Sequence, residues 1–215
     1  MAQPTPEIRA LRRSLRALRR SLPRDERRKA ERAIGNALRH LKLLRRGHHV
    51  AVYLAMPGEV NLRPTIEAGW RAGCLLYAPR ITSRRRCTME FVPLPPGARL
   101  RPNPSAFGIA EPVASPSARI GSFRLDAILM PVVGFDRHGN RLGMGAGYYD
   151  RALRRLRDGS RRWRRPRLVG LAFACQEVES IVPSAWDVPL DVIVTERGII
   201  VPRPQRTHSS PRSSP

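Results

Sequence analysis

The chain of 215 residues carries a net charge of +23, because 40 lysine and arginine residues face 17 aspartate and glutamate residues. Its length favours one medium-sized domain, and it contains neither an apolar run of about 18 residues nor a secretory signal, so we predict a cytoplasmic protein without a membrane span. Its three cysteines form no Cys-x-x-Cys pair, which argues against a disulfide framework and a zinc site.

The basic excess predicts affinity for polyanions. All but two of the 40 basic residues are arginines, the exceptions being Lys29 and Lys42. Such an excess favours nonspecific adhesion to nucleic acid at low salt. Because no nucleic-acid recognition motif accompanies the charge, we interpret the arginines mainly as solvated surface. Nucleic-acid binding by an otherwise inactive α/β scaffold stays open as an alternative function.

Residues 8–22 are predicted to form an amphipathic helix. Apolar side chains recur at steps of three and four residues, the spacing of one helix face: Ile8, Leu11, Leu15, Leu18 and Leu22. Arginines fill most other positions, and we interpret them as a solvated face from which one or two reach phosphate: Arg9, Arg12, Arg13, Arg16, Arg19 and Arg20. A second helix is predicted from Pro23 to Gly47, with Asp25 and Glu26 in its first turn.

The remainder alternates between short apolar runs and helical patterns. Predicted strands cover residues 49–54, 74–78, 88–92, 126–133, 167–173 and 191–195. Predicted helices cover residues 62–72 and 147–157, with a turn helix near 177–182 and a proline-rich loop at 93–118. Apolar strands that alternate with helices indicate a mainly parallel sheet. We therefore predict a single three-layer α/β domain over residues 1–201, with a twisted sheet, helices on both faces and basic N-terminal helices, followed by a disordered Pro/Ser/Arg-rich tail at 202–215.

The most informative segment runs from Pro131 to Arg151, where a predicted strand leads into a turn, three alternate glycines and a helix. Gly143, Gly145 and Gly147 let backbone N–H groups approach an anion without side-chain obstruction. The helix start behind them adds partial positive charge. This arrangement predicts a phosphate-binding loop.

Charged and aromatic side chains flank these glycines. Arg141 precedes them with a guanidinium suited to paired hydrogen bonds to phosphate oxygens. Asp150 follows in the first helical turn, where it either binds the metal ion of a nucleotide or stabilises the helix start. Tyr148 and Tyr149 lie at the mouth of the loop, one suited to stack on a flat ring and the other to the core. The spacing fits neither a P-loop nor a dinucleotide fingerprint.

The string FDRHGNRLGMGAGYYDR, residues 135–151, resembles the signature of the 5-formyltetrahydrofolate cyclo-ligases, also called 5,10-methenyltetrahydrofolate synthetases. Four further segments resemble that family in the same order: AVYLAMPGEV at 51–60, FGIAEP at 107–112, GLAFACQ at 170–176 and WDVPLD at 186–191. The resemblance covers roughly residues 8–200.

The resemblance implies an ATP-dependent conversion of 5-formyltetrahydrofolate to 5,10-methenyltetrahydrofolate, with release of ADP and phosphate, through phosphorylation of the formyl oxygen and ring closure by N10. It implies a set of ATP-binding residues: Arg9, Arg12, Arg141, Leu142, Gly143, Met144, Gly145, Ala146, Gly147, Tyr148 and Tyr149. It implies a set of folate-binding residues: Leu54, Met56, Glu59, Met144 and Tyr148. It also implies Mg²⁺ on Asp150 and Asp187, with Arg141 and Glu59 as the catalytic residues.

Alternatives remain at single positions and for the function. Spacing alone favours Glu59 as an exposed or helix-capping acid, whereas the resemblance places it on the folate. Ile8 stands where the family usually has a basic residue, and Asp191 is a reserve metal ligand. A sugar-phosphate isomerase or kinase of similar layered fold is a second alternative function. We expect the chain to be a monomer.

Overall fold

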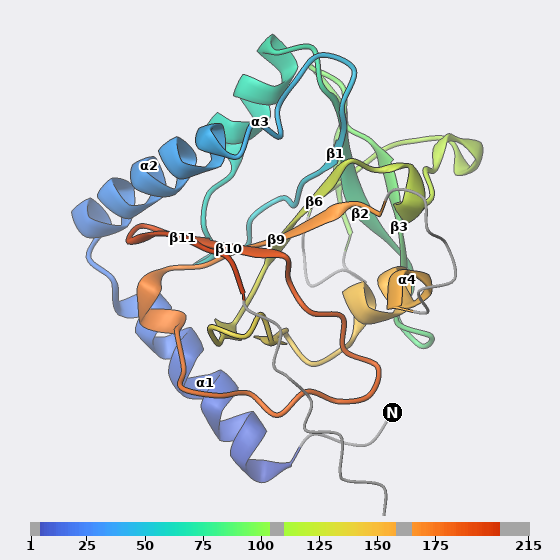
Figure 1. Ribbon diagram of the computed structural model, residues 1–215. Coiled ribbons are helices and arrows are strands. Elements are labelled where there is room, and N and C mark those ends of the chain that lie inside the picture. The colour runs from blue at the N-terminus through green and yellow to red at the C-terminus, as the bar shows by residue number, and fades with distance from the viewer. Residues whose placement is uncertain (1–4, 104–109, 158–164, 203–215) are drawn as a thin grey trace, which may run out of the picture.

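The computed structural model describes residues 5–103, 110–157 and 165–202, and its main feature is a seven-stranded sheet (Figure 1). The strand order is β11-β10-β9-β6-β1-β2-β3. The strands have these bounds: β1 (His49–Ala51), β2 (Leu75–Ser83), β3 (Thr88–Pro93), β6 (Ala127–Pro131), β9 (Arg167–Leu171), β10 (Val192–Thr195) and β11 (Gly198–Ile200). The inner strands, from β10 to β2, run parallel, and β3 and β11 pair antiparallel at the edges. The predicted mainly parallel sheet is confirmed.

Helices cover both faces of this sheet. Their bounds are α1 (Pro6–Ser21), α2 (Arg24–His40), α3 (Arg63–Arg71) and α4 (Tyr148–Arg157). Successive side chains of a strand point to opposite faces, and in β6 Leu129 belongs to one core cluster with Ile34 of α2. The next residue, Met130, belongs to a second cluster with Leu153 of α4. Figure 1 accordingly shows α2 and α3 on one side of the sheet and α4 on the other, as the prediction of three layers requires.

The structure corrects two predicted helix boundaries. α2 ends at His40 and not at Gly47, because Lys42 adopts a φ of 52° that interrupts the helix. The apolar residues that follow pack against the core without helical structure. The turn helix predicted near 177–182 lies instead at Ala174–Gln176, as a single 3-10 turn too short to carry a hydrophobic period.

Several short strands were not predicted. The loop predicted at 93–118 contains the antiparallel pair β4 (Leu100–Pro102) and β5 (Ala110–Pro112). The turn before the alternate glycines is itself a hairpin of β7 (Gly134–Phe135) and β8 (Arg141–Leu142). Strands of two or three residues that lie outside a longer apolar run are too short to display the pattern by which strands are recognised in a sequence. The predicted tail from residue 203 onward and residues 107–109 of the FGIAEP segment lie outside the described residues.

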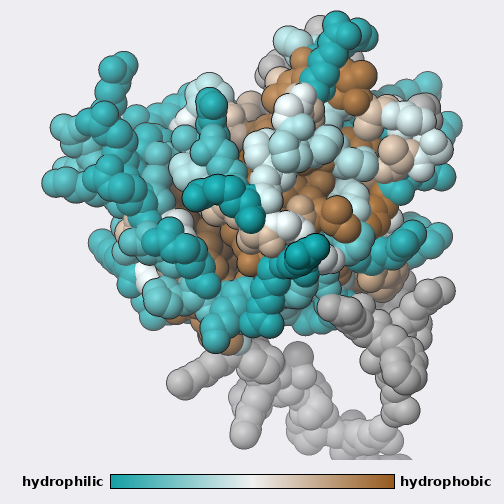
Figure 2. All heavy atoms as spheres, turned by 90° about the horizontal axis from the view of Figure 1, so that it is seen from above, coloured by the Kyte–Doolittle hydropathy of each residue, from teal (hydrophilic) through white to brown (hydrophobic). Residues whose placement is uncertain are grey.

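Most arginines of α1 and α2 are exposed, in agreement with a solvated basic surface. Figure 2 shows hydrophilic side chains over most of one face of the molecule, with hydrophobic side chains between them. Within the part of the chain that the structure describes, no helix is both long and apolar enough to cross a membrane.

A buried aspartate stabilises the hairpin β7–β8 through hydrogen bonds. Asp136 has no exposed surface, and its carboxylate accepts hydrogen bonds from the backbone N–H groups of His138, Asn140 and Ile181 at 2.9, 3.0 and 2.9 Å. Each bond satisfies a charged acceptor that is costly to bury unpaired. Asp136 therefore joins the turn before the glycines to the distant segment around Ile181.

We expect Gly139→Ala to lower the free energy of unfolding by about 1–3 kcal/mol. Gly139 has a φ of +90°, which L side chains rarely adopt, and an added Cβ would lie 2.8 Å from the Leu190 carbonyl oxygen. Gly97 has a φ of +71° with no atom within 4 Å of the added Cβ, so Gly97→Ala is a control for backbone strain alone. Urea unfolding of both variants checks the prediction, and equal losses would contradict the role given to the Leu190 contact.

Candidate active site

Two cavities adjoin at the glycine loop. The first is lined by the segment after β1, by the β2–β3 hairpin and by the start of α4. The second is lined by α1, by the glycines of the loop and by the segment before β10. Most of the loops involved follow the carboxyl ends of parallel strands, where ligand sites of α/β sheets lie.

Four residues form the wall between the cavities, because they line both of them: Arg141, Gly143, Gly147 and Asp150. The Arg141 guanidinium and the Asp150 carboxylate form an ion pair at 2.5 Å, with side chains 7% and 15% exposed. The Arg141 Nε is buried and has no hydrogen-bond partner among the described residues. A buried donor without a partner is costly, so the structure holds this guanidinium between the two cavities with one hydrogen-bond donor unsatisfied.

The glycine loop is held by α1. Arg12 donates a hydrogen bond from Nε to the Gly143 carbonyl oxygen at 3.0 Å. Gly145 has a φ of +103°, and a Cβ there would lie 3.6 Å from the Arg12 guanidinium. α4 begins at Tyr148, directly after Gly147, so the unpaired N–H groups of its first turn face the loop. The second cavity thus combines an arginine, a glycine backbone and a helix start.

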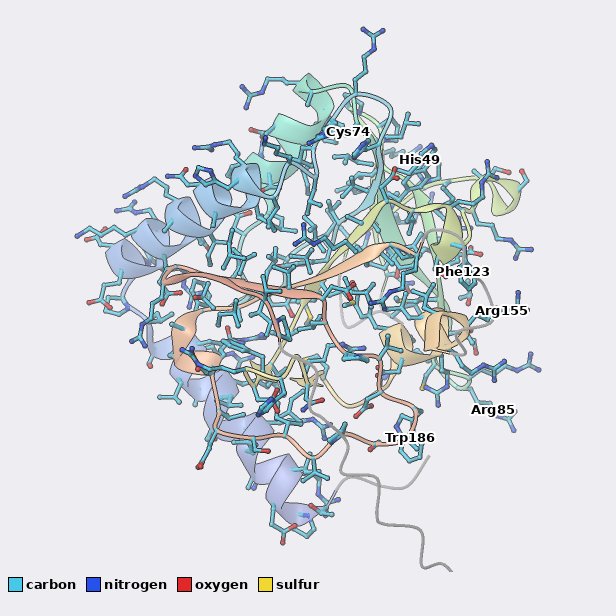
Figure 3. The ribbon with its side chains drawn as sticks, viewed as in Figure 1. His49, Cys74, Arg85, Phe123, Arg155 and Trp186 are labelled. Carbon is cyan, nitrogen blue, oxygen red and sulfur yellow. The ribbon has the colours of Figure 1, made fainter. Side chains whose placement is uncertain are left out.

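Asp150 and Asp187 both line the second cavity. Burial raises the pKa of the Asp187 carboxyl, and repulsion from Asp150 adds to this increase. A hydrogen bond from the Ser184 N–H, together with Arg141 and Arg12, lowers it. Trp186, which also lines this cavity, lies on the segment that leads into β10 (Figure 3). The two carboxylates therefore face one space near two cations.

These two carboxylates suit a magnesium ion that takes only some of its ligands from the protein, and do not form a metal site closed by protein ligands alone. Among the described residues, no group of three or more His, Cys, Asp or Glu side chains is placed to hold a metal. Mg²⁺ typically binds to one or two carboxylates and takes its other ligands from water and phosphate. Asp191, the reserve ligand, lines neither cavity and accepts the Leu168 N–H at 2.8 Å.

The first cavity contains a buried acid among mostly apolar walls. Glu59 is 8% exposed and accepts the Met56 N–H at 3.0 Å. Burial raises the pKa of the Glu59 carboxyl, whereas this hydrogen bond and the charge of Arg19 lower it. Leu54 and Met56 line the same cavity, as does Tyr149, whose phenol pKa is raised by burial and by the nearby Glu59.

The structure brings together most of the predicted site residues but not Arg9. Arg9 is exposed and lines neither cavity. Leu142 is buried beneath the glycine loop and lines the second cavity. Met144 and Tyr148, predicted for both substrates, line the first cavity. Ile8, in the place of a basic residue, lines the second.

Sequence reasoning missed Arg19, which we interpreted as solvated. Arg19 is 2% exposed, whereas Leu18, predicted to face the core, is 49% exposed. The buried face of α1 continues from Arg12 through Leu15 to Arg19, at steps of three and four residues. This helical spacing could have revealed that Arg19 is buried, but we assigned Arg19 to the solvated face because it is charged.

Two further polar residues shape the site without having been predicted. Gln176 is 1% exposed and donates from Nε2 to the carbonyl oxygens of Val132 and Val133 at 2.7 and 2.9 Å, which fixes the entry to the glycine hairpin. Glu111 lines the first cavity and accepts the Ile81 N–H at 2.8 Å, which ties β5 to β2.

Comparisons with known proteins show which sequences and structures this chain is similar to. The sequence model of the 5-formyltetrahydrofolate cyclo-ligase family matches residues 4–196. The 5-formyltetrahydrofolate cyclo-ligase of Escherichia coli (strain K12) is 36% identical over 148 residues, which is 69% of this chain and 78% of that protein. Its counterpart from Haemophilus influenzae is 31% identical over 187 residues, 86% of this chain and 95% of that protein. The solved structure of Aquifex aeolicus 5,10-methenyltetrahydrofolate synthetase is similar with a TM-score of 0.76 at 30% identity, over 97% of this chain and 99% of that one.

Proposed function

The chain belongs to the 5-formyltetrahydrofolate cyclo-ligase family, and from this premise we propose that its two adjoining cavities hold the two substrates of the reaction. The enzyme converts 5-formyltetrahydrofolate and ATP to 5,10-methenyltetrahydrofolate, ADP and phosphate. This assignment of sites rests on the wall that both cavities share, which is formed by Arg141, Gly143, Gly147 and Asp150. Two ligands that react with each other must meet, and residues that border both cavities are where ligands in the two cavities would come together.

The first cavity takes the folate. Its apolar walls suit a flat ring, and Glu59 supplies one buried carboxylate for the N–H groups of the pterin. Leu54 and Met56 contact the ring from the segment that also carries Glu59. Met144 and Tyr148 lie beside the wall and border the formyl group.

The second cavity takes the phosphates of ATP. Arg12, Arg141 and the N–H groups of the glycine loop contact the phosphate oxygens. Asp150 and Asp187 would hold the Mg²⁺ that accompanies ATP, and the ion when bound neutralises phosphate charge. Arg9, being exposed outside this lining, is at most a distant contributor of positive charge.

The chemistry needs alignment more than a protein nucleophile. The formyl oxygen attacks the γ-phosphorus, the bond to the bridging oxygen breaks, and ADP leaves. N10 then attacks the activated formyl carbon, phosphate leaves with the former formyl oxygen, and N10 loses its proton as the ring closes. Arg141, at the shared wall, stabilises charge on the transferring phosphoryl group, and Glu59 holds the pterin so that the formyl oxygen faces the wall.

The purified protein with 5-formyltetrahydrofolate and magnesium ATP is expected to produce an ATP-dependent rise in the absorbance of the methenyl product. Glu59→Gln should raise the KM for folate about 10- to 100-fold, because hydrogen bonds to a charged acceptor are lost. The KM for ATP should stay within about twofold, since Glu59 does not line the second cavity.

Glu67→Gln on α3, half-exposed and outside both cavities, is the matched control and should behave like the unaltered protein. An unchanged KM for folate in Glu59→Gln would rule out the pterin contact. A monomeric state and nonspecific adhesion to nucleic acid stay predictions from the sequence.

A further inference from the structure

Arg19 is a buried cation directly behind the acid of the folate cavity. Its side chain is 3% exposed, and its Nη2 lies 3.7 Å from the Oε1 of Glu59, whose side chain is 5% exposed. Arg19 is not among the residues that line either cavity. Arg19 can therefore affect the reaction only indirectly, through a neighbouring residue that lines a cavity.

The hydrogen bonds of Arg19 are too few to explain its burial. Its Nε has no partner among the described residues, and its Nη1 donates to the Val132 carbonyl oxygen at the long distance of 3.5 Å. A guanidinium has five N–H donors and does not lose its charge in proteins. Burying such a group is costly unless an opposite charge compensates it. Glu59 is the carboxylate that the structure places within 4 Å.

Among the groups around Glu59, the positive charge of Arg19 is needed to stabilise the buried carboxylate. The carboxylate faces the Met56 N–H from its own loop, Tyr53 from the segment after β1, Tyr149 from α4 and Arg19 from α1. Tyr53 is buried and Tyr149 is partly buried, and burial raises the pKa of both phenols, so Arg19 is the cation among these groups. A buried carboxylate keeps its charge only when hydrogen bonds or a nearby cation offset the loss of water.

We propose that Arg19 is a positioning residue that holds Glu59 in place as an anionic hydrogen-bond acceptor for the pterin. The inference rests on the proposed contact between Glu59 and the folate. A protonated Glu59 would present one hydroxyl group and lose acceptor capacity towards the N–H groups of the pterin. Arg19 thereby keeps the folate cavity competent at neutral pH without touching the folate.

The expected pH dependence follows from the opposing influences on Glu59. Burial raises the pKa of its carboxyl, while the Met56 N–H and Arg19 lower it. Without Arg19 the pKa rises further, so a larger fraction of Glu59 is protonated at a given pH. The resulting defect should be large at low pH and should shrink as the pH rises through the new pKa.

The test compares Arg19→Met, Arg19→Lys and the control Arg20→Met, which removes the same charge from the exposed neighbour. Arg19→Met keeps an apolar stem in the buried space and should raise the KM for folate about tenfold near neutral pH, because loss of the cation leaves more of Glu59 protonated. That KM should fall towards the value of the unaltered protein as the pH is raised. The KM for ATP should change less than about twofold. Arg19→Lys should restore most of the affinity for folate, and Arg20→Met should show no change.

A KM for folate that rises equally at all pH values in Arg19→Met, or that does not rise, would overturn the inference. If Arg19→Met does not fold, Arg19→Lys decides, because it should keep the normal pH profile, and a pH-independent defect in it would contradict the proposal. Glu59→Gln distinguishes a failure of the pterin contact from a failure of the role of Arg19. If it leaves the KM for folate unchanged, the pterin contact itself is wrong; if it raises this KM while Arg19→Met does not, only the role of Arg19 is wrong.

Discussion

Replacing Arg141 with alanine is expected to lower kcat about 10²- to 10³-fold, equivalent to about 2.7–4 kcal/mol of transition-state stabilisation, by analogy with the loss of one oxyanion donor. Arg141 lines both cavities, its side chain is 7% exposed, and its Nε has no partner among the described residues. A cation held in so little water acts strongly on charge that develops at the shared wall. Single-turnover measurements of methenyl product formation check the prediction.

Two variants control for other consequences of the change. Arg141→Lys keeps a positive charge but not the paired hydrogen bonds of a guanidinium, so it should recover only part of the lost rate. Arg137→Ala removes an exposed arginine from the same hairpin, paired with Glu177, and should keep near-full turnover. Thermal unfolding of all three shows whether the unpaired Asp150 destabilises the fold. Near-full turnover of a folded Arg141→Ala protein would refute the assignment of this arginine.

Asp150→Asn is expected to raise the Mg²⁺ concentration needed for half-maximal turnover by at least about 10- to 100-fold, the range measured when even outer-shell partners of a metal are lost. An amide is a weaker ligand for a hard cation than a carboxylate. The substitution also removes the partner of Arg141. Titration of turnover with Mg²⁺ at saturating ATP and folate measures the first effect.

Asp187→Asn distinguishes the two consequences, because Asp187 lines the same cavity without the hydrogen bond to Arg141. Both variants should raise the Mg²⁺ requirement, and Glu179→Gln, an exposed acid on the neighbouring segment, should not. If Asp150→Asn lowers turnover while neither variant changes the Mg²⁺ requirement, Asp150 orients Arg141 and is not a metal ligand. Binding of Mn²⁺ in the presence of ADP offers an independent measurement.

Much of the fold follows from local patterns. The apolar runs at β1, β6, β9 and β10 and the periodic helix α1 are readable because burial on a sheet or on one helix face imposes a regular spacing. The phosphate-binding loop is readable for a similar reason, since its glycines and Arg141 are neighbours in the chain. Features without a local period, such as the end of α2 near Lys42 and the short hairpin β7–β8, were misplaced or missed.

The sequence by itself determined the layered α/β class and the glycine loop, and its resemblance to a family supplied the candidate acids Glu59, Asp150 and Asp187. Only the tertiary structure decided which polar side chains are buried and what they contact: Arg19 against Glu59, Asp136 against Ile181, and Gln176 against Val132. The physical reason is that helix and strand periods arise from neighbours along the chain, whereas the burial of a charge is stable only with a partner that a distant segment brings to it.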